Sequence, residues 1–202
     1  NDNPELETAL SGLKDGFRFN NLQDGAVTMS SFFDGTSALY QMFSPGATSP
    51  SMLDMYFTAN DQETMDLYIY MDEGTGFILN DPEVMKMYYE KVSYDYLTSD
   101  IQNLSAAIFK KTGTNTYVPE ENALNRIGEH IIPGIYDALN LTSYEEFRYA
   151  TTELTVTLVD ENTINFDYTA VLTTTATSTR ITASFQFAEI GECELPYQPS
   201  IA

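Results

Sequence analysis

The sequence predicts an α+β fold, in which a curved antiparallel β-sheet built from strands early and late in the chain carries central helices on its concave face, like a half-barrel. Three observations predict it. Segments near both ends alternate apolar and polar residues with a period of two, which is typical of strands that bury one face. The middle of the chain instead has helix-start signals followed by apolar residues at three- and four-residue spacing. The connections between the early segments are too short for crossover helices, so these strands should pair antiparallel.

The length and composition favour one folded domain. The chain has 202 residues, of which 43% are apolar, including 12 Phe and 14 Tyr. This is enough apolar surface to offset the entropy lost when a core is ordered. We assign residues 1–16 to a polar tether and a short opening helix, residues 17–192 to a single α+β domain, and residues 193–202 to a C-terminal tail.

The opening helix is expected between Leu6 and Leu13. Leu6, Leu10 and Leu13 would share one helix face. Gly16 would end the helix, since glycine commonly follows the last helical turn.

Four short strands are expected before residue 80. They are Val27–Phe33, Ser37–Phe43, Met52–Ala59 and Thr64–Met71. Their separators are the turn sequences Asp34-Gly35, Ser44-Pro45-Gly46 and Asn60-Asp61. The fourth strand has the clearest pattern, because Met65, Leu67, Ile69 and Met71 would lie on one face and polar or tyrosine residues on the other.

Helices are expected in the middle of the chain. Asn80-Asp81-Pro82-Glu83 combines a cap, a first-turn proline and an acidic residue, which is a typical helix start. The apolar residues after it recur at helical spacing: Val84, Met87, Tyr88, Val92, Ile101, Leu104 and Ile108. A break near Thr98-Ser99-Asp100 divides them into two helices. Pro119-Glu120-Glu121 starts another helix that Pro133-Gly134 ends, and Ser143-Tyr144-Glu145-Glu146 forms a capping box.

Three long strands joined by hairpins are expected at the end. The strands are Ala150–Val159, Thr163–Thr175 and Thr179–Ala188. The turns between them are Asp160-Glu161-Asn162 and Ala176-Thr177-Ser178. Residues such as Ile164, Phe166 and Tyr168 give these strands an apolar face that needs a cover, and the helices of residues 81–140 are the segments long enough to provide it.

Charge and cysteine content exclude several functions. The chain has 30 acidic and 9 basic residues, a formal charge of −21. Nucleic acids and anionic membrane surfaces attract clustered positive charge, so neither is an expected partner. Cys193 is the one cysteine, which rules out an intrachain disulfide and a cysteine-rich zinc site.

The sequence predicts no catalytic residue, metal ligand or cofactor, and we expect a protein that is not an enzyme. His130 is the single histidine, and no serine lies in a Gly-x-Ser-x-Gly motif. Adjacent acids such as Glu120-Glu121 and Glu145-Glu146 are explained by helix starts. There is no EF-hand spacing and no glycine-rich phosphate loop.

The closing stretch, Phe147–Gly191, resembles the terminal meander of exported bacterial lipoproteins of unassigned function. The similar features are the Asp160-Glu161-Asn162 turn, the Ile164–Tyr168 strand, the threonine-rich hairpin, and Ser184-Phe185-Gln186-Phe187 before Ile190-Gly191. The opening Ala9–Phe17 is similar in style to the start of such domains. The strand-helix-strand plan also resembles the half-barrel of LolA-like lipoprotein carriers, which implies an apolar cavity able to hold acyl chains.

Methionine is concentrated where the sheet and its covering helix would meet. Six of the eight methionines lie between Met52 and Met87, and flexible methionine side chains often line adaptable apolar surfaces. We expect the lining of an apolar cavity at Met55, Met65, Leu67, Ile69, Met71, Met87, Tyr88, Phe166 and Phe185. Ordinary core packing is the alternative for these residues.

We therefore expect an exported, non-enzymatic binding protein at the cell surface or in the periplasm, holding a lipid or another small apolar ligand between sheet and helices. A lipid anchor, if there is one, would lie upstream of Asn1. The alternative is a cell-surface adhesion, glycan-contacting or scaffold module that has no ligand cavity and acts through outward Tyr and Thr side chains. The sequence does not predict the oligomeric state.

Overall fold

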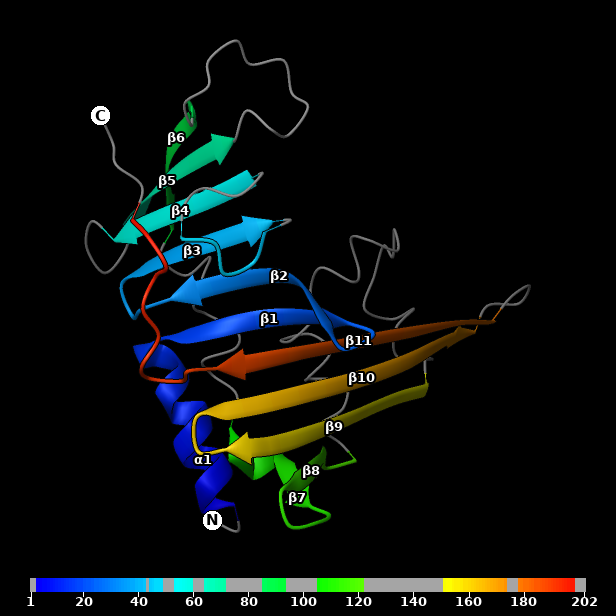
Figure 1. Ribbon diagram of the computed structural model, residues 1–202. Helices are drawn as coiled ribbons and strands as arrows, with labels where there is room; N and C mark the ends of the chain where they lie inside the picture. The colour runs from blue at the N-terminus through cyan, green and yellow to red at the C-terminus, as the bar shows by residue number, and fades with distance from the viewer. Residues whose placement is uncertain are drawn as a thin grey trace. The chain divides into compact units, whose positions relative to one another are not determined.

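A computed structural model describes residues 3–42, 44–48, 53–59, 64–71, 85–93, 105–121, 151–173 and 178–198 (Figure 1). These residues form one α-helix, two short 3₁₀ helices and eleven strands. In chain order the elements are α1 (Pro4–Ser11), η1 (Gly12–Asp15), β1 (Phe17–Gln23), β2 (Ala26–Phe33), β3 (Ser37–Met42), β4 (Leu53–Ala59), β5 (Thr64–Met71), β6 (Met85–Ser93), η3 (Ala106–Ile108), β7 (Phe109–Lys111), β8 (Thr116–Pro119), β9 (Thr151–Asp160), β10 (Thr163–Thr173) and β11 (Ser178–Ala188).

The seven strands predicted from alternation are present, within two residues of the expected bounds. The opening helix is also present, with Leu6 and Leu10 buried. The Asp160 turn forms as expected, because the Asp160 carboxylate accepts a hydrogen bond of 2.8 Å from the backbone N–H of Asn162.

The predicted fold class is wrong in its central helices. Residues 85–93, expected in a helix, form β6 and pair antiparallel with β5. Residues 106–119 contain η3, β7 and β8, so the part of the expected helix that falls at Ala106–Ile108 is a 3₁₀ turn followed by a strand. The described chain is mostly antiparallel strand with a single short α-helix, and no central helix covers a concave face within it. The other expected helix segments, 80–84, 94–104 and 122–150, lie outside the described residues.

The helix prediction fails at β6 because the sequence of this segment is compatible with both a helix and a strand. Its sequence, MKMYYEKVS, places apolar residues at helical spacing but is also rich in tyrosine and valine, which favour strands. Strand preference depends on the available partner, and β5 provides one along nearly the whole of β6. Tertiary pairing therefore decides the conformation.

The chain divides into two compact units. The α1 unit contains Asn1–Ser11 and Asp100–Phe185, and the β1–β6 unit contains Gly12–Ser99 and Gln186–Ala202. Compactness does not measure independent folding, so the single domain expected for residues 17–192 stays a prediction.

In the β1–β6 unit the strand order is β6-β5-β4-β3-β2-β1, and all neighbouring strands are antiparallel. The last residues of β11 lie beside β1. There the side-chain amide of Asn20 donates to the Gln186 side chain at 3.2 Å, and the rings of Phe17 and Phe187 meet edge to face at 5.1 Å. Beyond β11 the chain turns at Glu189 and Gly191, both with positive φ, and its C-terminal tail crosses this sheet (Figure 1).

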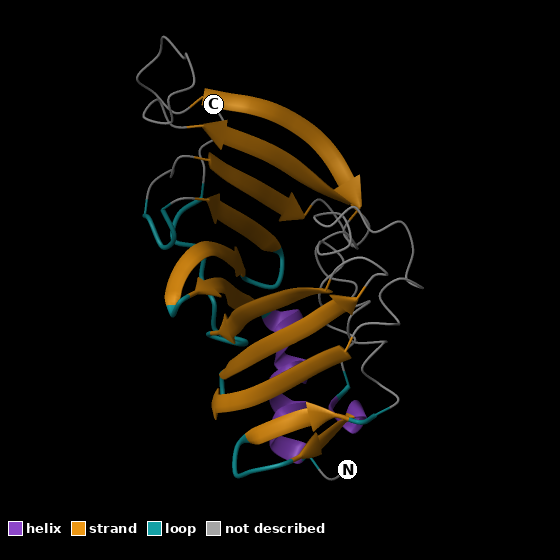
Figure 2. Cartoon of the chain, turned by 90° about the vertical axis from the view of Figure 1, so that its right-hand side faces the viewer, coloured by secondary structure: helices purple, strands orange, loops and turns teal. Residues whose placement is uncertain are grey.

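In the α1 unit the order is β11-β10-β9-β8-β7, and Figure 2 shows α1 behind these strands. Asn3, just before α1, fixes the helix to η3, because its side-chain amide donates to the carbonyls of Ala106 (3.2 Å) and Phe109 (2.7 Å). The Glu7 carboxylate accepts a hydrogen bond of 3.0 Å from the N–H of Ala106. These bonds satisfy backbone groups that would otherwise be orphaned at the ends of short elements.

Candidate functional site

One face of the sheet in the β1–β6 unit carries no charged side chain in β1–β5, and we call it the apolar face. Strand pairing arranges its residues in three rows across β2–β5. The first row is Phe33, Ala38, Phe57 and Leu67; the second is Ser31, Tyr40, Met55 and Ile69; the third is Met29, Met42, Leu53 and Met71. Phe17, Phe19 and Asn21 of β1 extend the three rows. In a chain of charge −21, this is a strong segregation of apolar side chains.

Local sequence explains why these residues share the face. Successive side chains in a strand point to opposite sides of the sheet. In β3, Ala38, Tyr40 and Met42 therefore lie on the apolar face, while Leu39 and Gln41 lie on the other. The acidic residues of β4 and β5 occupy the opposite parity, so all of them leave the apolar face.

The apolar face is closed at its first row and partly open beyond it. The first row is buried, with Phe57 at 2% and Leu67 at 9% exposure. In the second row Tyr40, Met55 and Ile69 are partly exposed, and so are Met29, Met42 and Leu53 in the third. The closed end is stiffened by aromatic contacts, including Tyr40 with Phe57 at a centroid distance of 5.5 Å.

A buried polar group lies within the second row. Ser31 is 6% exposed, and its hydroxyl makes no hydrogen bond within the described part of the chain. An unsatisfied buried hydroxyl is unfavourable by about 1–3 kcal/mol.

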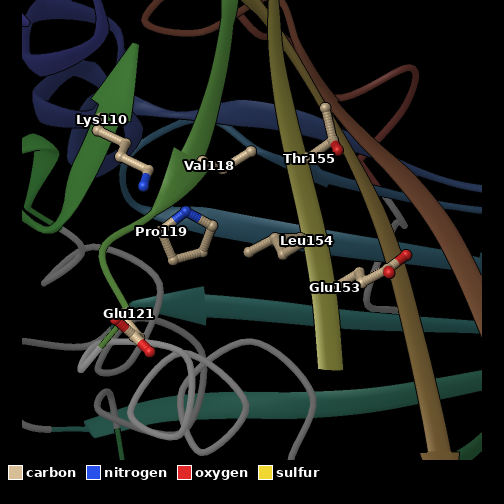
Figure 3. A pocket seen from close by; sticks show the side chains of 7 residues that line it. All are labelled: Lys110, Val118, Pro119, Glu121, Glu153, Leu154 and Thr155. Carbon is tan, nitrogen blue, oxygen red and sulfur yellow. The ribbon is translucent and has the colours of Figure 1, made fainter. Parts of the chain in front are cut away.

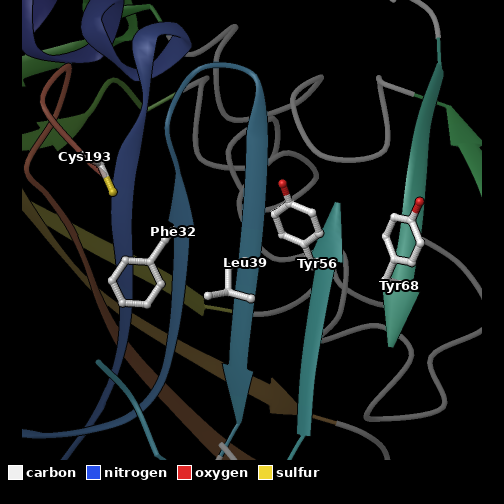
Figure 4. Packing of buried hydrophobic residues seen from close by; sticks show 5 residues of the cluster. All are labelled: Phe32, Leu39, Tyr56, Tyr68 and Cys193. Carbon is white, nitrogen blue, oxygen red and sulfur yellow. The ribbon is translucent and has the colours of Figure 1, made fainter. Parts of the chain in front are cut away.

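The opposite face of the same sheet is closed by the C-terminal tail. Figure 4 shows its buried cluster, Phe32, Leu39, Tyr56, Tyr68 and Cys193. Leu195 and Tyr197 of the tail pack against this cluster. The Tyr197 hydroxyl donates a hydrogen bond to the carboxylate of Asp54, which is fully buried. A second buried side chain, Gln41, bonds to the β3–β4 loop through Gly46 N–H (2.8 Å) and Ala47 C=O (2.9 Å).

Burial suppresses ionisation on this closed face. Burial raises the pKa of the Tyr68 hydroxyl, and the nearby charge of the Asp66 carboxylate raises it further. Burial also raises the pKa of the Cys193 thiol to about 11, despite an opposing backbone hydrogen bond at Phe33. Because the thiolate is the nucleophilic form, Cys193 is a packing residue in this environment.

The structure brings together most of the residues expected to line a cavity. Met55, Met65, Leu67, Ile69 and the backbone position of Met71 share the apolar face, with Met65 completely buried. Met87 and Tyr88 belong to β6, and their side chains lie outside the described part. Phe166 and Phe185 instead stack on each other at 5.1 Å in the core of the α1 unit. Their place in a ligand cavity stays a prediction.

Sequence reasoning missed part of the apolar face. The sequence places Tyr40, Met42 and Met29 in strands, but nothing in it marks these residues or Ser31 as part of a site. Their alternation with polar neighbours was visible. Their alignment with Met55 and Ile69 depends on strand register, which alternation in a single strand does not specify.

The described residues outside this sheet offer few groups that could bind a metal ion. Among the described residues, no three His, Cys, Asp or Glu side chains are grouped so as to hold a metal ion. No helix within the described ranges combines the length and apolar character needed to cross a bilayer. His130 lies outside those ranges.

Comparison with protein families, with curated proteins and with solved structures found no match to this chain. The resemblance to exported lipoproteins and lipoprotein carriers therefore stays an expectation from sequence.

Proposed function

We propose that this protein is a non-enzymatic binding protein whose apolar face holds a flexible apolar ligand of the acyl-chain type. The observation that carries the proposal is the uncharged, methionine-rich face of β1–β5, which is closed at one row and partly open at the next two. Exported location, at the cell surface or in the periplasm, belongs to the proposal and rests on the sequence resemblance.

The physical fit is between a deformable surface and a deformable ligand. Met29, Met42 and Met55 are unbranched and polarisable, so they can follow the shape of an acyl chain. Each methylene moved from water to such a surface contributes about 0.8 kcal/mol.

The test is a titration of the protein with cis-parinaric acid, a fatty acid whose fluorescence rises when it leaves water. We expect saturable binding by the unmodified chain. The double variant Met42→Gln with Met55→Gln should raise Kd about tenfold, because two partly exposed apolar contacts are replaced by polar ones. Val159→Gln is the matched control, since Val159 is 51% exposed in the α1 unit and should leave Kd unchanged.

Two results would contradict the proposal. One is the absence of saturable binding by protein whose circular dichroism shows intact strands. The other is equal affinity in the double variant and the control. Lipid extraction and mass spectrometry of protein made in cells gives a second readout, in which acyl species should co-purify with the unmodified chain and be depleted from the double variant.

A second copy of the chain is the competing occupant of the apolar face. Sedimentation equilibrium separates the two possibilities, because self-association would appear as a dimer that dissociates on dilution. A dimer that the Met42→Gln, Met55→Gln variant abolishes would replace the ligand proposal with self-association.

A further inference from the structure

The strands that carry the open part of the apolar face lie in a stretch of sequence without positive charge. Between Arg18 and Lys86 the chain contains no Lys, Arg or His. The same stretch contains ten acidic residues: Asp24, Asp34, Asp54, Asp61, Glu63, Asp66, Asp72, Glu73, Asp81 and Glu83. The strands β2, β3, β4 and β5 and the connections between them belong to this stretch. They therefore offer no cation to a ligand on the apolar face.

The basic residue that precedes this stretch, Arg18, lies on the closed face of the sheet. It pairs with Phe32, which belongs to the buried cluster under the C-terminal tail (Figure 4). The Arg18 guanidinium lies over the Phe32 ring, 5.2 Å from its centroid, and the Arg18 Nε donates to the side-chain oxygen of Asn20 at 3.2 Å. These contacts hold the positive charge on the face opposite the apolar one.

The basic residues of β6, which follow this stretch, have register positions on the closed face as well. Lys86 pairs with Tyr70, and Lys91 pairs with Asp66. Even-numbered residues of β5 share the closed face with Asp54, which is opposite Tyr70 in β4. The lysine positions of β6 therefore do not belong to the apolar face.

The charged residues next to the rows of the apolar face are acidic. Within β6, Glu90 pairs with Leu67 and so takes a position that extends the first row. At the opposite end of the strands, the β1–β2 turn follows the third-row pair of Asn21 and Met29, and this turn carries the exposed Asp24. The formal charge of −21 on the chain adds a long-range field of the same sign.

Head-group charge therefore affects which amphiphile fits this face. A carboxylate or phosphate beside an apolar surface loses part of its hydration, and a cation or several N–H donors must replace that hydration. The strands β2–β5 have no cationic side chain for this purpose. At low ionic strength, an acidic residue about 10 Å away weakens binding of an anion about twofold in water. Several acidic residues multiply this effect.

We propose that the apolar face selects amphiphiles with an uncharged or cationic head group over those with a carboxylate or phosphate head group. This inference rests on the proposed function and names the ligand class, which is an acyl ester, a long-chain alcohol or a long-chain amine. A fatty acid still binds through its chain, because its methylene groups make the same contacts as those of an ester. Its carboxylate lowers the affinity.

The test is displacement of bound cis-parinaric acid from the full chain at pH 8 by three amphiphiles with twelve-carbon chains, each below its micellar concentration. Glycerol monododecanoate is uncharged, dodecylammonium is cationic and dodecanoate is anionic. At about 20 mM salt, half displacement should need an about fivefold higher concentration of dodecanoate than of either other amphiphile. At about 0.5 M salt this difference should fall below about twofold, because salt screens charges but leaves the chain contacts in place.

Two substitutions at one position locate the selectivity on the apolar face. Met42 is the middle position of the third row, so the other positions of that row in β1–β5 lie within two strand spacings, about 10 Å. Met42→Lys places a cation in the row and should reduce the difference between dodecanoate and glycerol monododecanoate to about twofold or less at low salt. Met42→Gln is the matched control, because it removes the same thioether without adding charge. It should weaken both ligands alike and keep their ratio.

The outcomes separate this inference from the proposed function. Absence of saturable binding of cis-parinaric acid contradicts the proposed function, and the charge selectivity falls with it. If the probe binds but dodecanoate displaces it at the same concentration as the uncharged ester, or at a lower one, the charge selectivity is wrong and the proposed function stands. A ratio that is equal in Met42→Lys and Met42→Gln, both with intact strands by circular dichroism, would overturn the assignment of the selectivity to the apolar face.

Discussion

The hydrogen bond from Tyr197 to Asp54 should fix the C-terminal tail to the sheet of the β1–β6 unit. Tyr197→Phe removes the donor and keeps the ring that packs on the buried cluster. We expect the free energy of unfolding to fall by about 1.5–3 kcal/mol, the range for a hydrogen bond to a charged group. The acceptor, Asp54, is fully buried, so water cannot readily replace the lost donor.

A double-mutant cycle isolates this interaction from the packing of the tail. Tyr197→Phe, Asp54→Asn and the combined variant should give a coupling energy of about 0.5–3 kcal/mol, as for residues in contact. Tyr56→Phe is the control, because Tyr56 lies in the same cluster and takes no part in the hydrogen bond between Tyr197 and Asp54. The control should change stability by less than about 0.5 kcal/mol.

Urea unfolding followed by circular dichroism measures the free energy, since the chain has no tryptophan to report by fluorescence. The reaction rate of Cys193 with a thiol reagent gives a local readout, because this cysteine is buried in the same cluster. Tyr197→Phe should increase that rate. The reasoning is refuted if both the unfolding free energy and the Cys193 reaction rate match those of the unmodified chain.

Three further changes test other parts of the structure. Gly16→Ala should lower the free energy of unfolding by about 3 kcal/mol or more, because φ is +122° and a Cβ would lie 2.5 Å from a backbone oxygen. Gly25→Ala is the control, since φ is +79° and a Cβ would have no atom within 4 Å, and it should lower stability by about 1 kcal/mol. Equal losses of the two variants in urea unfolding would contradict this. The pKa of the Cys193 thiol is raised to about 11, so this thiol stays protonated in the folded state, whereas the unfolded thiol ionises above about pH 8.5. The free energy of unfolding should therefore fall between roughly pH 9 and 11. Cys193→Ser should flatten that part of the pH profile. Phe166→Ala should lower stability by about 3–5 kcal/mol, since this ring is 1% exposed, and a thermal scan showing no loss would contradict the assignment of a filled core.

The late strands could be predicted because two independent signals agree. Ile164, Phe166 and Tyr168 alternate with polar residues, and the turn before them has an Asp side chain able to bond its own backbone. Period and turn chemistry then specify the same hairpin. The register follows, because a shift by one residue would expose the whole apolar set.

The short strands β7 and β8 had no comparable signal. Phe109–Lys111 and Thr116–Pro119 are too brief to show a period, and the proline at the end of β8 argues against a central strand. They form because the β7–β8 hairpin satisfies its own backbone and then joins β9 at a few residues. The same proline that hides the strand in the sequence lies just beyond the last pair with β9, where it lines a cleft of about 440 Å³ with Val118 and Leu154 (Figure 3).

The candidate site was predictable within one strand but not across strands. Met65, Leu67 and Ile69 follow one another at a period of two, so their common face can be read from the sequence. Adding Met42 and Met55 requires knowing which residues are opposite each other in neighbouring strands. That information belongs to the pairing and has no trace in local periodicity.

The distribution of charge favours a small neutral or weakly anionic ligand over a second copy on the apolar face. Two copies that met through this face would bring together two chains of charge −21, and this repulsion opposes association at moderate ionic strength. An acyl chain gains the same apolar contact without that penalty. The segregation of Asp54 and Asp66 to the other side of the sheet thus has two effects: it keeps the apolar face free of charge, and it leaves the protein acidic enough to resist pairing through that face.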